Sequence, residues 1–477
     1  MRSVPTIREL IARIRVAPST PEPRAPHPVA AIAATPTRPR LADHASRFVQ
    51  LEREVWDRFR PQVRDAVQAR LDALSSADTG QASTICCGQP MRCHDHRPVH
   101  WLTWVGRVHA RIPRYRCAQC RAERRPLLEA LEVEPGQPSG WLARQLGLLG
   151  CVASYPLAAQ LAAPLFGITI NAMAIWRAVQ RLGEAAAQHT EALSAYHADA
   201  PSAVEPTDAP PAVVVAVDGC MLGMQVRTTR RRRHAKAPHA PLPPVDDGHF
   251  REVKTGVLLR PADRVEISRG RHGLVRRLLV TCLGDADALF ARVWAHLREV
   301  GWLGPQTIVV VIGDGSEWIW QRATLFVRRC EILDFWHAME YAWAYARLQF
   351  GDGSRRAQQW TQRLAQDLKA GQVEAVLARL HTLRPRSPES REALAALIQY
   401  YTTHAARMQY DEYQRLGYGI GSGAVESAHK QVVHARLRQA GMRWSVVGAR
   451  RLLALRLLLL NGDWGQTDQL RLVRVGA

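Results

Sequence analysis

Two short apolar runs, each followed by an aspartate, constrain the fold of this chain more than any other feature. Val213 to Val217 precedes Asp218, and Ile308 to Ile312 precedes Asp314 by one glycine. Uninterrupted β-branched runs predict strands in a sheet interior, and ligands bind where such strands end. Each aspartate also precedes a glycine, and Asp-Gly is a common turn dipeptide. One such site alone is explained by a turn, but two at equivalent strand ends favour a shared site.

The order of the remaining elements predicts the fold class. Strands are expected to end at Arg260, around Val265 and at His337, and a helix is expected from Asp285 to Val300. Three strands that can form a hairpin ladder, then a helix and a fourth strand, are typical of an RNase H-like mixed sheet in an α/β protein. A long helical segment from Ala338 to about Tyr413 interrupts this domain.

The whole chain divides into eight expected segments. They are a Pro/Ala/Arg-rich arm expected to be disordered (1–42), an amphipathic helix (43–80), a zinc-ribbon-like module (81–130), a helical, helix-turn-helix-like DNA-binding module (131–197), the first part of the catalytic domain (198–337), its helical insertion (338–420), the second part of the catalytic domain (421–464) and a tail (465–477).

A third carboxylate, Glu426, follows the tight turn Gly421-Ser422-Gly423, in which Ser422 is the expected N-cap of a helix. From Ser427 to Gly462 there is no acidic residue, whereas seven basic ones occur. Glu426 is explained either as a partner of the helix dipole or as a third ligand beside the two aspartates. Three carboxylates of this kind suit two divalent ions, Mg²⁺ or Mn²⁺, that catalyse in-line phosphoryl transfer.

The charge of the chain favours a polyanionic partner. The formal net charge is +21 over 477 residues, and such a surplus produces a positive surface potential. No apolar run approaches the roughly 20 residues of a membrane-spanning helix. We therefore expect double-stranded DNA as the partner, no membrane association, and a bacterial cytoplasmic, nucleoid-associated location.

Four segments together resemble a known family. The order VAVDGC, VIGDGSEWIW, DFWHAMEYAW and GSGAVESAHK, ending in RQAGMRW, is similar to the DDE transposases of bacterial insertion sequences, and most closely to the ISKra group. The resemblance implies that Asp218, Asp314 and Glu426 form the catalytic triad. It also implies that Asp334 and His337 match a [C/D]xxH motif at the start of the insertion.

His337 and several tryptophans have alternative explanations. His337 lies between a strand and aromatic residues, where it would face the site or simply be hydrogen-bonded in the core. Tryptophans at this spacing stack on unpaired bases or belong to the core; they are Trp318, Trp320, Trp336, Trp343 and Trp444.

Cysteine spacing predicts a structural zinc site. Cys117 and Cys120 form a CxxC knuckle, and Cys87, followed by glycine, is the safer ligand of an irregular first knuckle. The fourth ligand is taken as Cys86, with Cys93, His94 and His96 as alternatives. A metal-free hairpin is the competing interpretation.

Basic residues in several segments are candidates for DNA contact. Asn171, Arg177 and Arg181 lie on the second helix of a possible helix-turn-helix, which is otherwise an ordinary helical hairpin. Arg231 and Arg232 belong to a basic run that either contacts phosphates or is a solvated loop. The basic stretch after Glu426 adds Lys430, Arg436, Arg443 and Trp444.

These observations predict a DDE transposase that cleaves the terminal inverted repeats of its element and transfers the strands to target DNA. Bringing two ends together implies a homo-oligomer. Two alternatives remain: a structure-specific nuclease on the same fold, and a domesticated, non-catalytic DNA-binding protein with a zinc module.

Overall fold

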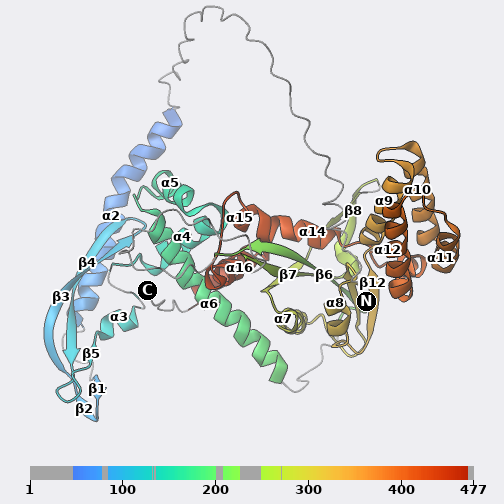
Figure 1. The fold of residues 1–477 in the computed structure, drawn as a ribbon. Helices are drawn as coiled ribbons and strands as arrows, with labels where there is room; N and C mark the ends of the chain where they lie inside the picture. Colours follow the sequence, from blue (N-terminus) through green and yellow to red (C-terminus); the bar gives the residue numbers. More distant parts are fainter. Residues whose placement is uncertain are drawn as a thin grey trace, which may run out of the picture.

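The computed structural model describes residues 47–77, 84–131, 133, 136–199, 208–225, 249–269 and 271–470. A five-stranded mixed sheet lies near the centre of the molecule, the N-terminal modules lie on one side of it and a helical insertion lies on the other (Figure 1). None of the helices in these ranges is long and apolar enough to span a bilayer.

The central sheet has the strand order β10-β7-β6-β11-β12. Its strands are β6 (Ala212–Gly223), β7 (Phe250–Leu259), β10 (Leu278–Leu283), β11 (Ile308–Gly313) and β12 (Arg329–Leu333). The pairs β6·β7 and β7·β10 are antiparallel, whereas β6·β11 and β11·β12 are parallel. This mixed sheet is compatible with an RNase H-like domain.

Three details of the expected strands are wrong. The segment around Val265, β8 (Arg264–Ser268), pairs with β9 (Arg271–Leu274) outside the central sheet, because its polar, largely exposed residues cannot fill a sheet edge that β10 covers with buried ones. β6 continues past Asp218 to Gly223. β12 ends at Leu333, so His337 lies in a helix and not at a strand end.

Helices cover both faces of the sheet. α7 (Ala286–Glu299) packs against β7 and β10, with Val293 close to Gly256. α14 (Gly423–His429) contacts β6 and β7 and is followed by a π-helical turn, η4 (Lys430–His434). α15 (Ala435–Leu437) and α16 (Val446–Leu460) follow, and α16 packs on β10 and on α6. In Figure 1, α14 and α7 lie on opposite sides of the sheet.

The insertion is helical, as the sequence predicts. Its helices are α9 (Phe335–Phe350), α10 (Arg355–Lys369), α11 (Val373–Thr382), α12 (Pro388–His404) and α13 (Tyr410–Arg415). They gather beside β12 and α8 (Glu317–Ala323) at one end of the sheet (Figure 1).

The N-terminal part begins with the long helix α2 (Arg47–Ala77). Next come the hairpin strands β1 (Ile85–Cys86) and β2 (Gln89–Pro90), then the sheet β3 (Arg92–Thr103), β4 (Gly106–Arg116) and β5 (Glu123–Arg124). The helices are α3 (Pro126–Ala130), α4 (Gly140–Val152), α5 (Tyr155–Phe166) and α6 (Ala172–Asp199). Gly167 ends α5 at φ 61°, a left-handed conformation that glycine adopts without strain.

Candidate active site and cysteine cluster

Asp218 and Asp314 lie on neighbouring parallel strands. Ala216 of β6 is the register partner of Ile312 of β11, and each aspartate follows two residues further along. Local backbone groups orient both carboxylates: Oδ1 of Asp218 accepts from the Gly219 N–H at 2.7 Å, and Oδ1 of Asp314 accepts from the Ser316 N–H at 3.0 Å. The fold therefore brings together two acidic residues that are far apart in sequence.

The environment of Asp218 disfavours its charge. Burial, followed by the nearby charge of Asp314, raises the pKa of Asp218 to about 6. A buried carboxylate beside a second one is ionised more readily when a cation is bound between them. The pair is thus suited to hold a divalent cation.

His429 of α14 is a neighbour of Asp218 that sequence reasoning missed. Its Nδ1 lies 3.5 Å from Oδ2 of Asp218, and its side chain is 6% exposed. Burial, with a contribution from His434, lowers the pKa of His429 to about 4, so the imidazole is neutral at pH 7. Its spacing from Glu426 was the available signal, because residues three apart share one face of a helix.

Glu426 lies on the same helix but is not assembled with the aspartates. Its side chain is 68% exposed and pairs with Lys430, whose Nζ lies 2.7 Å from Oε1. Within the described residues, the one group of three or more potential ligand atoms that lie within 4.8 Å of one another consists of cysteines. Asp218, Asp314 and Glu426 therefore do not form a preassembled three-carboxylate cluster in this conformation.

Asp334 connects the insertion to the turn that precedes Glu426. The carboxylate is buried; Oδ1 accepts from the Trp336 N–H at 2.6 Å, and Oδ2 accepts from the Ser422 N–H at 2.8 Å. The Ser422 hydroxyl also donates to Asp334, so Ser422 stands at the N-cap position of α14 but makes no side-chain cap there. Asp334 in turn caps α9.

His337 lies in the first turn of α9, and its Nδ1 is 3.3 Å from Oδ2 of Asp334. Burial acts to lower the pKa of His337, but interaction with Asp334 and the charges of Glu340 and Asp314 outweigh it and raise that pKa to about 9. The imidazole is therefore positively charged at pH 7. Its charge also lowers the pKa of Asp218, which places it in the same electrostatic environment.

The insertion also contacts the backbone at Asp314. The hydroxyl of Tyr400, on α12, donates to the Asp314 carbonyl at 2.6 Å, and its ring stacks on Tyr341 of α9 at 4.0 Å. Gly315 has φ 91°, and a Cβ there would lie 2.7 Å from the Tyr400 hydroxyl. A side chain at Gly315 would therefore disturb this contact.

A cavity of about 1010 Å³ opens on the sheet face that carries Asp218. Ala216, which shares that face because strand side chains alternate, lies in its floor. Trp336 at its wall is 63% exposed. Four basic residues line the cavity, and its described lining contains no acidic side chain; the basic residues are Arg264, Arg276, Arg277 and Lys369.

Two of the expected DNA contacts are in the protein core. Arg436 is 1% exposed; its Nε donates to the Gly150 carbonyl at 2.9 Å and its guanidinium lies over the Tyr155 and Trp444 rings. Trp444 is 9% exposed and its Nε1 donates to the Leu437 carbonyl. Neither presents a surface to DNA, because both help pack the C-terminal helices against the N-terminal helical module.

The other expected contacts differ in exposure. Arg177 and Arg443 are exposed, and Arg443 lies over the Phe250 ring. Arg181 is buried, and Asn171 accepts the Ala174 N–H as a cap of α6. Arg231 and Arg232 lie outside the described residues.

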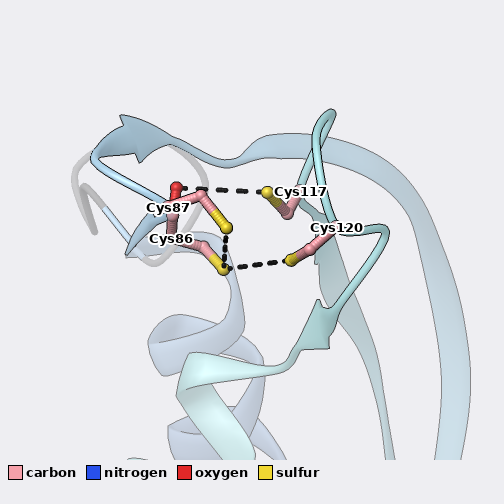
Figure 2. Close-up of side chains that lie close together, drawn as sticks. All are labelled: Cys86, Cys87, Cys117 and Cys120. Atoms are coloured by element: carbon pink, nitrogen blue, oxygen red, sulfur yellow. Dashed lines mark hydrogen bonds between the residues drawn. The ribbon is translucent and has the colours of Figure 1, made fainter.

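Four cysteines converge where two turns meet (Figure 2). Sγ of Cys86 lies 3.5 Å from Sγ of Cys120 and 3.9 Å from that of Cys87. Cys117 completes the set, whose ligand atoms all lie within 4.8 Å. Cys93, His94 and His96 are not part of it.

Backbone geometry supports this convergence. Cys87 and Gly88 have φ values of 50° and 72°, which form the tight first turn. Hydrogen bonds from the backbone at Cys120 and Gln119 lower the pKa of Cys117 to about 7, while bonding to Cys120 and Cys117 raises that of Cys86 to about 12. Four clustered sulfur ligands can hold a metal such as zinc.

Comparisons with known proteins do not assign the chain to a family. No family model matches the chain, and no curated protein matches it. Among solved structures, the chain is similar to the Drosophila P element transposase strand transfer complex, with 10% identity, a TM-score of 0.33, and coverage of 68% of this chain and 92% of that chain.

Proposed function

We propose that this protein is a DDE-type transposase that cleaves DNA at the ends of an insertion sequence and transfers the strands to a target. The observation that carries the proposal is the side-by-side placement of Asp218 and Asp314 on parallel strands, with the pKa of Asp218 raised by burial and by Asp314. A structural ion pair would bring opposite charges together, whereas two adjacent carboxylates favour the binding of a cation.

Asp218 and Asp314 are proposed as ligands of Mg²⁺ or Mn²⁺, since hard carboxylate oxygens prefer such ions. The bound ions would supply activation of a water or 3′-hydroxyl and stabilisation of the leaving oxygen. Glu426 is proposed as the third ligand, and it must exchange its contact with Lys430 for one with the site. Helix α14 already reaches Asp218 through His429, one turn further on.

The charged side chains around the site suit a DNA substrate. Protonated His337, held by Asp334, is proposed to donate to a phosphate oxygen at the site. The basic cavity beside the carboxylates would attract the phosphate backbone, and exposed Trp336 in its wall offers a face for an unstacked base. We propose that the four-cysteine cluster holds structural Zn²⁺ in a module that recognises the terminal repeats.

The test is to incubate the purified protein with Mg²⁺ and a plasmid carrying the repeats that flank its gene, and to sequence the products. Strand cleavage at the repeats with joining to new target positions supports transposition. Cleavage without joining indicates a nuclease, and binding without any change in the DNA indicates a non-catalytic DNA-binding protein.

A further inference from the structure

The N-terminal half of α2 exposes an apolar stripe that the described part of the chain does not cover. Leu51 is 56% exposed, Val55 48%, Phe59 49% and Val63 40%. Their spacing of four residues places them along one side of the helix. A contiguous exposed apolar stripe on a helix marks an interaction surface.

Only one flank of this stripe is available to a partner. On the other flank, the Trp56 ring lies 6.1 Å from that of Trp104, and Nη2 of Arg60 donates to the Gly167 carbonyl at 2.9 Å. These contacts anchor α2 to its own chain. In Figure 1 the N-terminal half of α2 extends beyond the β3–β4 hairpin.

The open flank carries charges that alternate in sign. In order they are Arg47, Glu54, Arg58 and Asp65, all of them exposed; Oδ1 of Asp65 also accepts from the Arg64 guanidinium of its own helix. When two copies meet along this flank, an antiparallel arrangement centred at the level of Trp56 sets Arg47 opposite Asp65 and Glu54 opposite Arg58. A parallel arrangement sets this flank against the opposite flank of the second copy, which carries Trp56 and Arg60, so the charge pairs are not formed.

The apolar stripe is centred one residue from the centre of the charge pattern. About a two-fold axis through Val55, Leu51 lies opposite Phe59 of the second copy, and Val55 meets Val55. A two-fold interface uses the same patch on both subunits, so each favourable pair occurs twice. Pro61 lies three residues after Arg58 and four before Asp65, so the helix period places it on the charged flank, beside the apolar stripe and not within it.

We propose that α2 is a homodimerisation helix, and that two copies of this protein pair through it antiparallel, with Leu51, Val55 and Phe59 in the seam and Arg47–Asp65 pairs at its ends. The proposal is independent of the catalytic assignment. A reaction on two DNA ends is expected to need a homo-oligomer, and the proposal defines the surface through which it forms. The occupant of that surface is a second copy of the chain.

The first experiment measures the mass of the full chain by light scattering after gel filtration over a range of concentrations. Val55→Asp places two carboxylates on the axis and should raise the dissociation constant of the dimer by about 100-fold or more. Arg53→Asp is the matched control, because it adds the same acid on the side away from the seam and should leave the dimer intact. Circular dichroism checks that both variants keep their helices.

The second experiment tests the orientation and does not depend on the apolar variant. Arg47→Asp and Asp65→Arg should each weaken the dimer about tenfold, and the double variant should restore it. Residues 18 positions apart in one helix cannot touch, so rescue has to come from contact between copies. A wild-type chain that stays monomeric, equal effects of Val55→Asp and Arg53→Asp, or a double variant no tighter than the single ones would overturn the proposal.

Discussion

Nδ1 of His429 lies 3.5 Å from Oδ2 of Asp218, across the contact between helix α14 and strand β6. The distance links two segments more than two hundred residues apart. It shows that the helix carrying Glu426 is docked on the strand carrying the first aspartate, with a buried neutral imidazole at the point of contact.

His429 is therefore expected to position the Asp218 carboxylate. Outer-shell partners of metal ligands typically contribute 10- to 100-fold to activity, so His429→Leu should lower the rate of DNA cleavage by about that factor. His429→Asn keeps a polar atom near the Nδ1 position and should recover most of the rate. Equal rates for the two variants, at equal melting temperatures, would show that His429 only fills space.

Glu426 is either a catalytic ligand or a surface residue that stabilises its helix. As a ligand, Glu426→Gln should abolish cleavage and bind DNA at least as well, because one negative charge is lost from a basic surface. Lys430→Ala is the matched control, since it breaks the same ion pair but keeps the carboxylate. A residue acting only through the helix dipole would instead cost about 0.3 to 1 kcal/mol of stability and leave cleavage near normal.

The His337–Asp334 pair predicts a pH dependence of stability. The pKa of His337 in the folded chain is about 9, above the ordinary value of 6.5. The stabilisation is therefore complete below about pH 6.5 and is lost as the pH rises through 9. Between pH 6.5 and pH 9.5, the free energy of unfolding measured in urea should fall less for His337→Asn than for wild type. An identical loss in both would contradict the pairing; His381→Asn, an exposed histidine on α11, serves as the control.

The cysteine cluster predicts one bound zinc per chain. Metal binding and folding are coupled in such modules, so Cys117→Ser and Cys120→Ser should lose zinc in elemental analysis and lower the melting temperature of the module. Cys93→Ser, an exposed cysteine outside the cluster, should keep both. Zinc-free wild-type protein purified without chelators would favour the metal-free hairpin.

Arg436 and Arg443 allow burial to be separated from DNA contact. Arg436→Gln removes a buried guanidinium from the Gly150 carbonyl and two aromatic rings, so it should lower the melting temperature. Arg443→Gln should leave stability nearly unchanged and, if Arg443 contacts a phosphate, reduce the slope of log K against log salt by about 1. An unchanged slope removes Arg443 from the DNA contacts.

Local sequence patterns predicted the strands and helices whose formation depends mainly on residues close together in the chain. The apolar runs before Asp218 and Asp314 predicted two central strands, and the segment from Ala338 to about Tyr413 was expected to be helical. The third strand was misplaced because the alternation around Val265 looks like a strand, which it is, but its partner β9 lies outside the main sheet. Pairing between distant segments cannot be read from local alternation.

The sequence predicted the two aspartates of the candidate site but not the residues that contact them. Tyr400 reaches Asp314 only through tertiary packing, so no local pattern marked it, and the only local signal for His429 was its helical spacing from Glu426. Arg436 was assigned to DNA because it belongs to the basic stretch after Glu426, and Trp444 was a candidate for base stacking with the core as the alternative. The structure instead buries them together, where the guanidinium stacks on the indole.

The most direct test of the account is strand cleavage by Asp314→Asn, measured with Mg²⁺ on a labelled duplex that carries one terminal repeat. The substitution keeps size and shape but removes one of the two adjacent negative charges. The account predicts no cleavage above background with end binding within about twofold of wild type. Cleavage at the wild-type rate by this variant would contradict the metal site at Asp218 and Asp314, and with it the proposed function.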